Sequence, residues 1–271
     1  MNWWTSEIRD QIAYIKIADW EAMGVDAVFN CRAGGDSLPP YNSLNLALHV
    51  GDEPETVLMN RSRLMQVLSA STVQMVCCQQ VHGTTVQRAD RSDAGCGALD
   101  MASAIPDCDA LLTNSPGLYL TEFFADCFPL YFFDPVRRVV ALAHAGWKGT
   151  IGRIAEKTLQ EMNRCFACRY DDVRVFIGPG IGPCCFEIGP DLAGRVAGGF
   201  PDHSRLLRSE AGRTTWDLAL TNTVILAGMG VKPENIQSCG LCTSCHPELF
   251  YSYRRDDGIT GRMGAVIGLR W

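Results

Sequence analysis

The stretch VVALAHAG, residues 139–146, joins an uninterrupted apolar run to a histidine and a glycine. Five consecutive apolar residues are typical of a strand buried on both faces, because each face of a strand shows every second side chain. The run ends at His144, and Gly146 then lets the backbone approach a ligand closely. We therefore expect an interior strand with a metal-capable side chain at its carboxyl end.

The flanking sequence predicts a mixture of strands and helices. A helix is expected from Asp52, as the capping residue before Pro54, to about residue 68. A second is expected after Thr150 as its cap, and a third over 216–229. Further strands are predicted over 27–31, 73–82, 109–113, 118–126, 130–134, 173–177, 249–253 and 265–269. No linker is visible, so we predict an α+β fold, with mixed β-sheets layered with helices, in a single domain over residues 1–271.

Charge and hydropathy exclude two kinds of partner. The net charge is −6, and no tract is rich in lysine or arginine, so we expect no nucleic-acid partner. No apolar stretch could cross a bilayer, and the first ten residues lack the apolar block of a secretory signal. We therefore expect no membrane partner and a cytoplasmic location. The sequence carries no signal for the oligomeric state.

Thirteen cysteines are present, and without an export signal most are interpreted as small buried residues kept reduced. Two pairs are adjacent, Cys77-Cys78 and Cys184-Cys185, and strand alternation would turn such neighbours to opposite faces.

Two cysteine spacings and one glycine-rich stretch imitate functional motifs. Cys239, Cys242 and Cys245 crowd one short segment without a distant partner pair, so we predict no second metal site there. Cys165-X2-Cys168 lacks a thioredoxin-like context. The stretch 178–183 lacks the third glycine of a dinucleotide loop, so we interpret it as a tight turn.

Three predicted strands end in residues that can bind a metal: His82, Cys127 and His144. Two histidines and one cysteine form a plausible zinc set that leaves a fourth position open. Such a site keeps a net positive charge, which can acidify a bound water or polarise an oxygen. The alternative is that these residues are two core histidines and a buried thiol.

Many blocks in order give the chain a close resemblance to a known family. The blocks are Arg32-Ala-Gly-Gly35, Pro40-Tyr-Asn-Ser-Leu-Asn-Leu46, Val50-Gly-Asp-Glu-Pro54, Gln80-Val-His-Gly83, Ala125-Asp-Cys127 with Pro129, His144-Ala-Gly-Trp-Lys-Gly149, Gly178-Pro-Gly-Ile-Gly-Pro-Cys-Cys185, Cys242-Thr243, Phe250-Tyr-Ser-Tyr-Arg-Arg255 and Thr260-Gly-Arg262. Through almost its whole length the chain resembles the bacterial YfiH/YlmD family, called multicopper polyphenol oxidase or laccase-domain proteins and related to human laccase domain-containing protein 1.

The resemblance implies that His82, Cys127 and His144 are zinc ligands. It also implies phosphorolysis of adenosine, inosine and methylthioadenosine, with deamination of adenosine as a second activity, so the expected partners are a purine nucleoside and phosphate. Lys148 departs from the family's usual arginine, and lysine cannot reproduce the bidentate fork of arginine on a phosphate.

Copper chemistry is the less favoured use of the same ligands. His2Cys resembles a blue-copper set, so Cu2+ is an alternative cofactor to Zn2+. A multicopper oxidase needs more histidines than the five present here, and no His-X-His occurs. Three alternatives stay open: polyphenol oxidase activity, a cysteine hydrolase with Cys127 as the nucleophile, and a non-catalytic nucleoside-binding protein.

Candidate catalytic and substrate-binding residues surround the predicted ligands. Asp126, next to Cys127, is the candidate acid or base, and the alternative is a carboxylate that orients a ligand or caps a turn. The chain lacks the His-X-Glu and Pro-Cys-X-X-Cys signature of zinc deaminases. The candidate substrate-binding residues, two cations for phosphate and two hydrogen-bonding amides, are Arg32, Lys148, Asn45 and Gln80.

Overall fold

The computed structural model describes residues 2–271. Within this range the α-helices are α1 Ala18–Glu21, α2 Pro54–Val67, α3 Trp147–Ile151, α4 Ile154–Phe166, α5 Pro190–Gly199, α6 His203–Leu206 and α7 Leu218–Gly228. The strands are β1 Thr5–Arg9, β2 Ile12–Lys16, β3 Val25–Asn30, β4 Met75–Cys77, β5 Val86–Arg88, β6 Ala110–Thr113, β7 Tyr119–Phe124, β8 Phe128–Asp134, β9 Val139–Ala145, β10 Arg174–Ile177, β11 Leu207–Glu210, β12 Arg213–Trp216, β13 Ile236–Ser238 and β14 Met263–Leu269.

The strands form two six-stranded sheets and a small hairpin. The first sheet has the order β1-β2-β3-β14-β7-β4, and the second has the order β13-β10-β8-β9-β6-β5. Both are mixed, because β4 pairs in parallel with β7 and β10 pairs in parallel with β13, whereas most other pairs are antiparallel. The α+β fold class is therefore confirmed.

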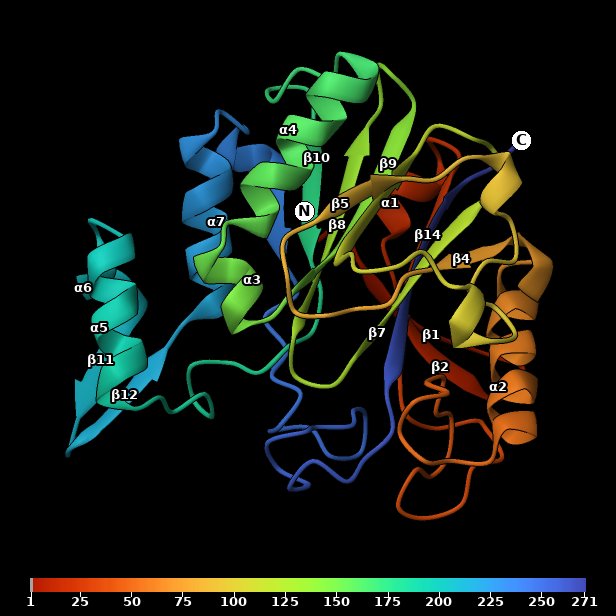
Figure 1. Ribbon diagram of the computed structural model, residues 1–271, viewed down its shortest axis with the longest axis horizontal. Helices are drawn as coiled ribbons and strands as arrows, with labels where there is room; N and C mark the ends of the chain where they lie inside the picture. Colours follow the sequence, from red (N-terminus) through yellow and green to blue (C-terminus); the bar gives the residue numbers. More distant parts are fainter. Residues whose placement is uncertain (1) are drawn as a thin grey trace.

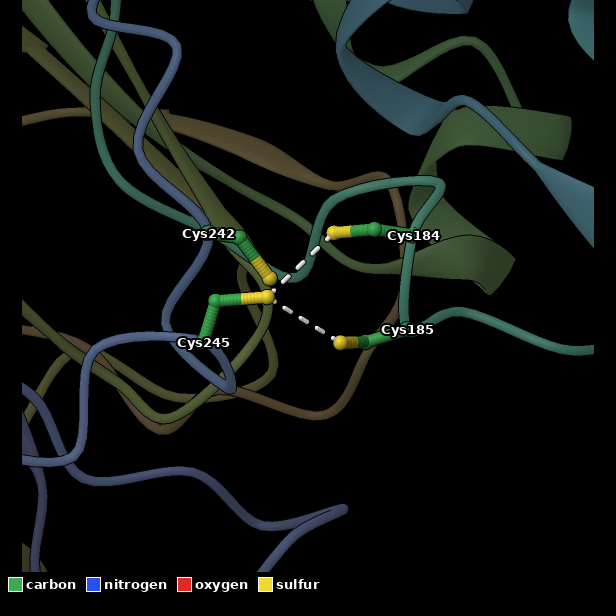
Figure 2. Close-up of side chains that lie close together, drawn as sticks. All are labelled: Cys184, Cys185, Cys242 and Cys245. Atoms are coloured by element: carbon green, nitrogen blue, oxygen red, sulfur yellow. Dashed lines mark hydrogen bonds between the residues drawn. The ribbon is translucent and has the colours of Figure 1, made fainter.

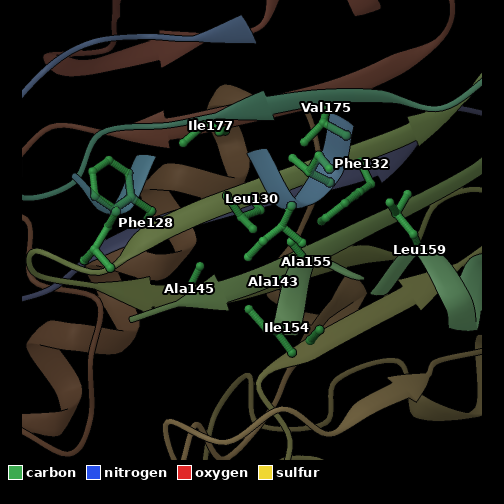
Figure 3. Packing of buried hydrophobic residues seen from close by; sticks show 14 of the residues in the cluster. Phe128, Leu130, Phe132, Ala143, Ala145, Ile154, Ala155, Leu159, Val175 and Ile177 are labelled. Carbon is green, nitrogen blue, oxygen red and sulfur yellow. The ribbon is translucent and has the colours of Figure 1, made fainter. Parts of the chain in front are cut away.

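The sheets and helices stack in four layers (Figure 1). Helix α2 packs on the outer face of the first sheet. The two sheets pack face to face over an apolar layer that includes Phe29, Phe124 and Phe133. Helices α4 and α7 cover the outer face of the second sheet, where Leu159 packs against strand residues such as Phe132 (Figure 3). Because the two sheets share one apolar layer, we retain the prediction of a single domain.

Strand alternation decides which side chains enter the layer between the sheets. In β9, Ala141 and Ala143 face the helices, whereas Val140 and Leu142 face the first sheet. The prediction that this strand is buried on both faces is thus confirmed. His144 continues the series of Val140 and Leu142, so its ring enters the interior of the sandwich. By the same alternation Glu122 of β7 faces the layer between the sheets.

Several sequence expectations about local structure are wrong. Helix α2 begins at Pro54 as predicted, but its cap residue is Glu53, because Asp52 bonds to Glu53 N and to Asn45 instead. Thr150 does not cap a helix, since it lies inside the short helix α3. Residues 249–253 form no strand, and the strand predicted over 73–82 is reduced to β4 with an irregular segment after it.

The adjacent cysteine pairs behave in two ways. Cys77 and Cys78 point to opposite faces of the first sheet, as alternation predicts. Cys184 and Cys185 lie in a turn that Cys185 N closes onto the Gly182 carbonyl, so the expectation of opposite faces is wrong for them. Among residues 2–271, no helix combines the length and the apolar character needed to span a membrane.

Candidate metal centre

The three predicted metal ligands meet where the chain passes from one sheet to the other. His82 lies on the connection from β4 in the first sheet to β5 in the second, and Cys127 lies on the connection from β7 to β8. His144 reaches the same point from β9. Their donor atoms all lie within 4.8 Å of one another, and the two imidazole centroids are 4.8 Å apart at an interplanar angle of 74°.

A buried carboxylate, Asp109, bonds to the ring of His144 and to the backbone of His82. Its Oδ1 lies 2.9 Å from His144 Nδ1 and accepts from His82 N at 2.9 Å, and its Oδ2 accepts from Gly83 N at 2.6 Å. Because Nδ1 of His144 donates to this carboxylate, Nε2 is left with the lone pair that a metal needs. Sequence reasoning missed this role. The available signal was one acidic residue at the start of an apolar strand.

The backbone around the candidate ligands has unusual φ angles and comes unusually close to two of their side chains. His82 and Asp126 have φ angles of 57° and 85°, which non-glycine residues seldom adopt and which concentrate at functional sites. A Cβ on Gly146 would lie 2.8 Å from Cys127 Sγ and 3.3 Å from His82 Cδ2. The glycine is thus required for the thiol and the imidazole to share this space.

The electrostatics favour a charged thiolate. Burial alone would raise the pKa of Cys127, but His144 and His82 stabilise its anion and lower the pKa to about 6. Burial likewise opposes protonation of His144, yet the Cys127 thiolate and Asp109 raise its pKa to about 10. Without a metal the pair is therefore a thiolate and an imidazolium, and metal binding would release the imidazolium proton.

The donor set fits a divalent metal ion. One thiolate and two imidazoles from chain-distant elements converge, a carboxylate fixes one tautomer, and the histidine at the rim, His82, is exposed. Three protein donors leave room for an outside ligand, as in catalytic rather than structural zinc sites. Two cavities, of about 670 and 290 Å3, lie elsewhere and include none of the three candidate ligands.

Three of the four predicted substrate-binding residues bond to the protein backbone. Arg32 donates to the carbonyls of Asn42 and Pro247. Asn45 is fully buried, accepts from Arg262 N and donates to Asp52.

Gln80 and Lys148 lie nearer the predicted ligands in sequence. Both amide atoms of Gln80 bond to the backbone of Phe123, which fixes the chain just before His82. Lys148 is exposed, with its Nζ 5.6 Å from the centroid of the Trp147 ring. The substrate roles of all four residues stay predictions.

Asp126 is engaged through both carboxylate oxygens. Oδ1 accepts from Thr243 Oγ1 at 2.6 Å, and Oδ2 accepts from Arg254 N at 2.7 Å. Its own carbonyl accepts from Ile181 N. These bonds favour the alternative of a positioning residue that holds loops against the Cys127 segment, and the acid or base role stays a prediction.

Arg262 is a second residue that sequence reasoning did not select. Burial lowers its pKa, while the negative charges of Cys127 and Asp126 act in the opposite direction. Its Nη1 donates to the carbonyls of Thr260 and Gly261, and its Nη2 has no hydrogen-bond acceptor among residues 2–271. The Arg262 guanidinium thus acts electrostatically on the candidate ligand Cys127 and keeps one terminal nitrogen available for an anion.

The structure also gathers four cysteines that the sequence did not pair. Cys184, Cys185, Cys242 and Cys245 have sulfurs within 4.8 Å of one another. The premise that Cys242 and Cys245 have no distant partner pair is therefore wrong, because that pair comes from the loop after β10, while the absence of a second metal site stays a prediction. Cys239 lies outside the group.

The fold and the site together define an α+β protein with a candidate His2Cys metal centre at the junction of two sheets. The chain belongs to the family described as "Multi-copper polyphenol oxidoreductase laccase", whose model matches residues 26–270.

Named relatives and solved structures agree with this assignment. The chain is 41% identical over 249 residues to the "Purine nucleoside phosphorylase YlmD" of Geobacillus stearothermophilus, with 91% of each chain covered. It is 34% identical to the "Purine nucleoside phosphorylase YfiH" of Escherichia coli, over 93% of this chain and 98% of the relative. The crystal structure of YlmD from Geobacillus stearothermophilus matches with a TM-score of 0.94 at 38% identity, covering 100% of both chains. The structure of the Bacillus licheniformis protein YfiH matches with a TM-score of 0.92 at 34% identity, covering 97% of both.

Proposed function

We propose that this chain is a zinc-dependent purine nucleoside phosphorylase. The observation that carries the proposal is the convergence of His82, Cys127 and His144 beside Asp109, in a chain whose relatives are named purine nucleoside phosphorylases. We further propose adenosine, inosine and methylthioadenosine as nucleosides, and deamination of adenosine as a second activity.

The proposed roles follow from where each group lies. His82, Cys127 and His144 would hold the zinc ion, which supplies a Lewis acid for an oxygen of the substrates. Asp109 holds His144 in the tautomer that can ligate. We propose Arg262, whose positive charge interacts electrostatically with Cys127, as the group that binds phosphate.

In phosphorolysis a phosphate oxygen bonds to the anomeric carbon of the ribose while the bond to the purine nitrogen breaks. The products are ribose 1-phosphate and the free base, and the leaving base takes up a proton. Asp126 is the proposed source of that proton. Each turnover must then return a proton to Asp126 from solvent or from phosphate.

The test is a product assay on metal-replete protein. Each nucleoside is incubated with and without inorganic phosphate. Free base and ribose 1-phosphate that appear only with phosphate support phosphorolysis, and inosine from adenosine without phosphate supports deamination. Cys127→Ser is expected to reduce turnover by more than about 100-fold, because it removes a metal ligand. The matched control, Cys165→Ser at the end of α4, should keep wild-type turnover. Absence of product from every nucleoside contradicts the proposal and favours a nucleoside-binding protein.

A cysteine hydrolase is the second candidate, and the low pKa of Cys127 beside His144 favours it. The two proposals predict opposite effects of metal removal. Chelation should abolish the activity of a zinc-dependent phosphorylase. In a cysteine hydrolase, chelation should instead free the Cys127 thiolate and raise the hydrolase activity.

A copper-dependent polyphenol oxidase finds less support in the site. The His2Cys group is the one histidine-containing metal group among residues 2–271, and it has two histidines. Multicopper oxidation of phenols needs further copper sites rich in histidine. We therefore propose Zn2+ rather than Cu2+ at this centre.

A further inference from the structure

Four cysteine sulfurs converge on the outer side of two neighbouring loops. Cys184 and Cys185 lie in the loop that follows β10, and Cys242 and Cys245 lie in the loop that follows β13. Because β10 and β13 are parallel neighbours, both loops leave the same edge of the second sheet. Figure 2 shows the sulfurs of the first pair turned toward those of the second.

The spacing of the sulfurs suits one metal ion. Cys245 Sγ lies 3.5 Å from Cys184 Sγ and 3.4 Å from Cys185 Sγ, and all four sulfurs fall within 4.8 Å of one another. A zinc ion with bonds of about 2.3 Å to four sulfurs at tetrahedral corners would hold them about 3.8 Å apart. A disulfide needs about 2.05 Å and joins two sulfurs, so it leaves the convergence of the other two unexplained.

The backbone of the site is already arranged for thiolates. Cys242 and Cys245 have the Cys-X2-Cys spacing of a zinc knuckle. Gly182 N donates to Cys242 Sγ at 3.2 Å, and a Cβ on Gly182 would lie 3.2 Å from the sulfur of Cys184. Gly182 therefore supplies a backbone hydrogen-bond donor to one sulfur, and its lack of a side chain leaves room for the sulfurs to converge.

The backbone around the cluster favours ionisation of one of its four thiols. Burial opposes ionisation of Cys242, but the backbone N–H groups of Gly182 and Cys245 lower its pKa. Burial raises the pKa of Cys184, and hydrogen bonding to Cys185 raises that of Cys245 to about 11. The backbone thus favours the thiolate of Cys242, and a bound dication would take the other sulfurs as thiolates as well.

Two arginines bond to the loops of the cluster, and one of them, Arg255, also pairs with Asp256. Four thiolates and one Zn2+ carry a net charge of −2. Arg254 donates to the carbonyl of Glu187, and Arg255 donates to the carbonyl of Thr243, both within two residues of cluster cysteines.

We propose that Cys184, Cys185, Cys242 and Cys245 bind a Zn2+ ion in a structural site. Four protein ligands close the coordination shell, so the ion fastens the two loops and performs no chemistry. Each coordinated thiol loses its proton to solvent on binding.

The fastened loops lead directly to the first centre. Thr243 lies between the two knuckle cysteines and donates to Asp126, while Ile181 N donates to the carbonyl of Asp126. Asp126 precedes Cys127 in the chain, so the second ion would stabilise the segment that carries this ligand.

Zinc analysis of protein purified under reducing conditions tests the proposal. Wild-type protein is expected to hold two equivalents of zinc, and Cys184→Ser with Cys245→Ser should reduce this to one. The control removes two cysteines outside the cluster, Cys165→Ser with Cys239→Ser, and should retain two equivalents. Removing His82 and His144 should also leave one equivalent, so the outcome is independent of the proposed phosphorylase activity.

Thiol alkylation of the wild-type protein tests the same proposal without relying on the folding of a variant. Zinc should protect the four cluster thiols from alkylation under native conditions, and a chelator should expose them, as peptide mass mapping would reveal. The proposal is overturned if the cluster double variant binds as much zinc as wild type. It is equally overturned if the four thiols react alike with and without zinc, or if the reduced preparation retains a disulfide between the two loops.

Discussion

Replacement of Asp109 by asparagine should weaken metal binding although it leaves the three candidate ligands in place. The carboxylate accepts four hydrogen bonds, two on each oxygen, from His144 Nδ1 and from the backbone N–H groups of His82, Gly83 and Val81. Asparagine keeps one acceptor and turns an NH2 group toward two donors, so two of the four bonds are lost.

The magnitude follows from those bonds. Each hydrogen bond to a charged group contributes about 1.5–3 kcal/mol, so the metal-free protein should lose about 3–6 kcal/mol of unfolding free energy. Loss of a carboxylate that orients a ligating histidine typically lowers metal affinity by about 10–100-fold, or about 1.4–2.7 kcal/mol.

Two measurements separate these effects. Competition with a chromogenic chelator gives the zinc affinity, and urea unfolding in the presence of a chelator gives the stability. The control is Asp134→Asn, a fully buried aspartate at the end of β8 in the same sheet, whose Oδ1 accepts from Val136 N and Arg137 N. Asp134→Asn should leave zinc affinity unchanged. Wild-type zinc affinity in Asp109→Asn, or an equal loss in the control, would refute the reasoning.

Three further predictions test the surroundings of the centre. Burial raises the pKa of Glu122 well above its usual range, so its folded form holds a proton that the unfolded chain releases above about pH 4.3. Relative to Glu122→Gln, metal-free wild type should lose about 1.4 kcal/mol of stability per pH unit from there up to the folded pKa, and parallel urea-unfolding profiles would contradict this. Gly146→Ala should abolish zinc binding because its Cβ overlaps the Cys127 sulfur. The control Gly194→Ala, in an open helical position, should keep zinc binding and gain about 0.5–1 kcal/mol of unfolding free energy. Tight zinc binding by Gly146→Ala would show that the ligands can move apart. Arg61→Met removes three 2.7 Å bonds to buried carbonyls and should cost about 3 kcal/mol or more in urea unfolding, and a loss below about 1 kcal/mol would mean that water replaces the guanidinium.

The three candidate metal ligands could be selected from the sequence because each one lies at the end of a predicted strand. His144 ends an apolar run, and His82 and Cys127 follow strand-like segments and precede residues that interrupt a strand. Asp109 could not be selected in this way, because a single aspartate before a strand has many uses. Its role depends on the register that places His144 N against the Asp109 carbonyl, across the β6–β9 pair.

The four-cysteine group shows the opposite case. The sequence shows the Cys-X2-Cys spacing of Cys242 and Cys245 but does not indicate which other cysteines lie near them. There are 56 residues between Cys185 and Cys242, and only the parallel pairing of β10 with β13 brings their loops together. Arg32, Asn45 and Gln80 illustrate the same limit, since the sequence did not indicate the hydrogen bonds that each side chain makes within the protein.

By itself the sequence determined most of the apolar strands, the helices α2 and α7, the α+β class and the three residues of the candidate metal centre. These features depend on interactions within a few residues, such as alternation, helical periodicity and the ends of apolar runs. The tertiary structure alone decided which strands are neighbours, which carboxylate supports the histidines and which cysteines meet. Those outcomes depend on the packing of two sheets against each other, where the free energy is summed over many distant contacts and no short segment records it.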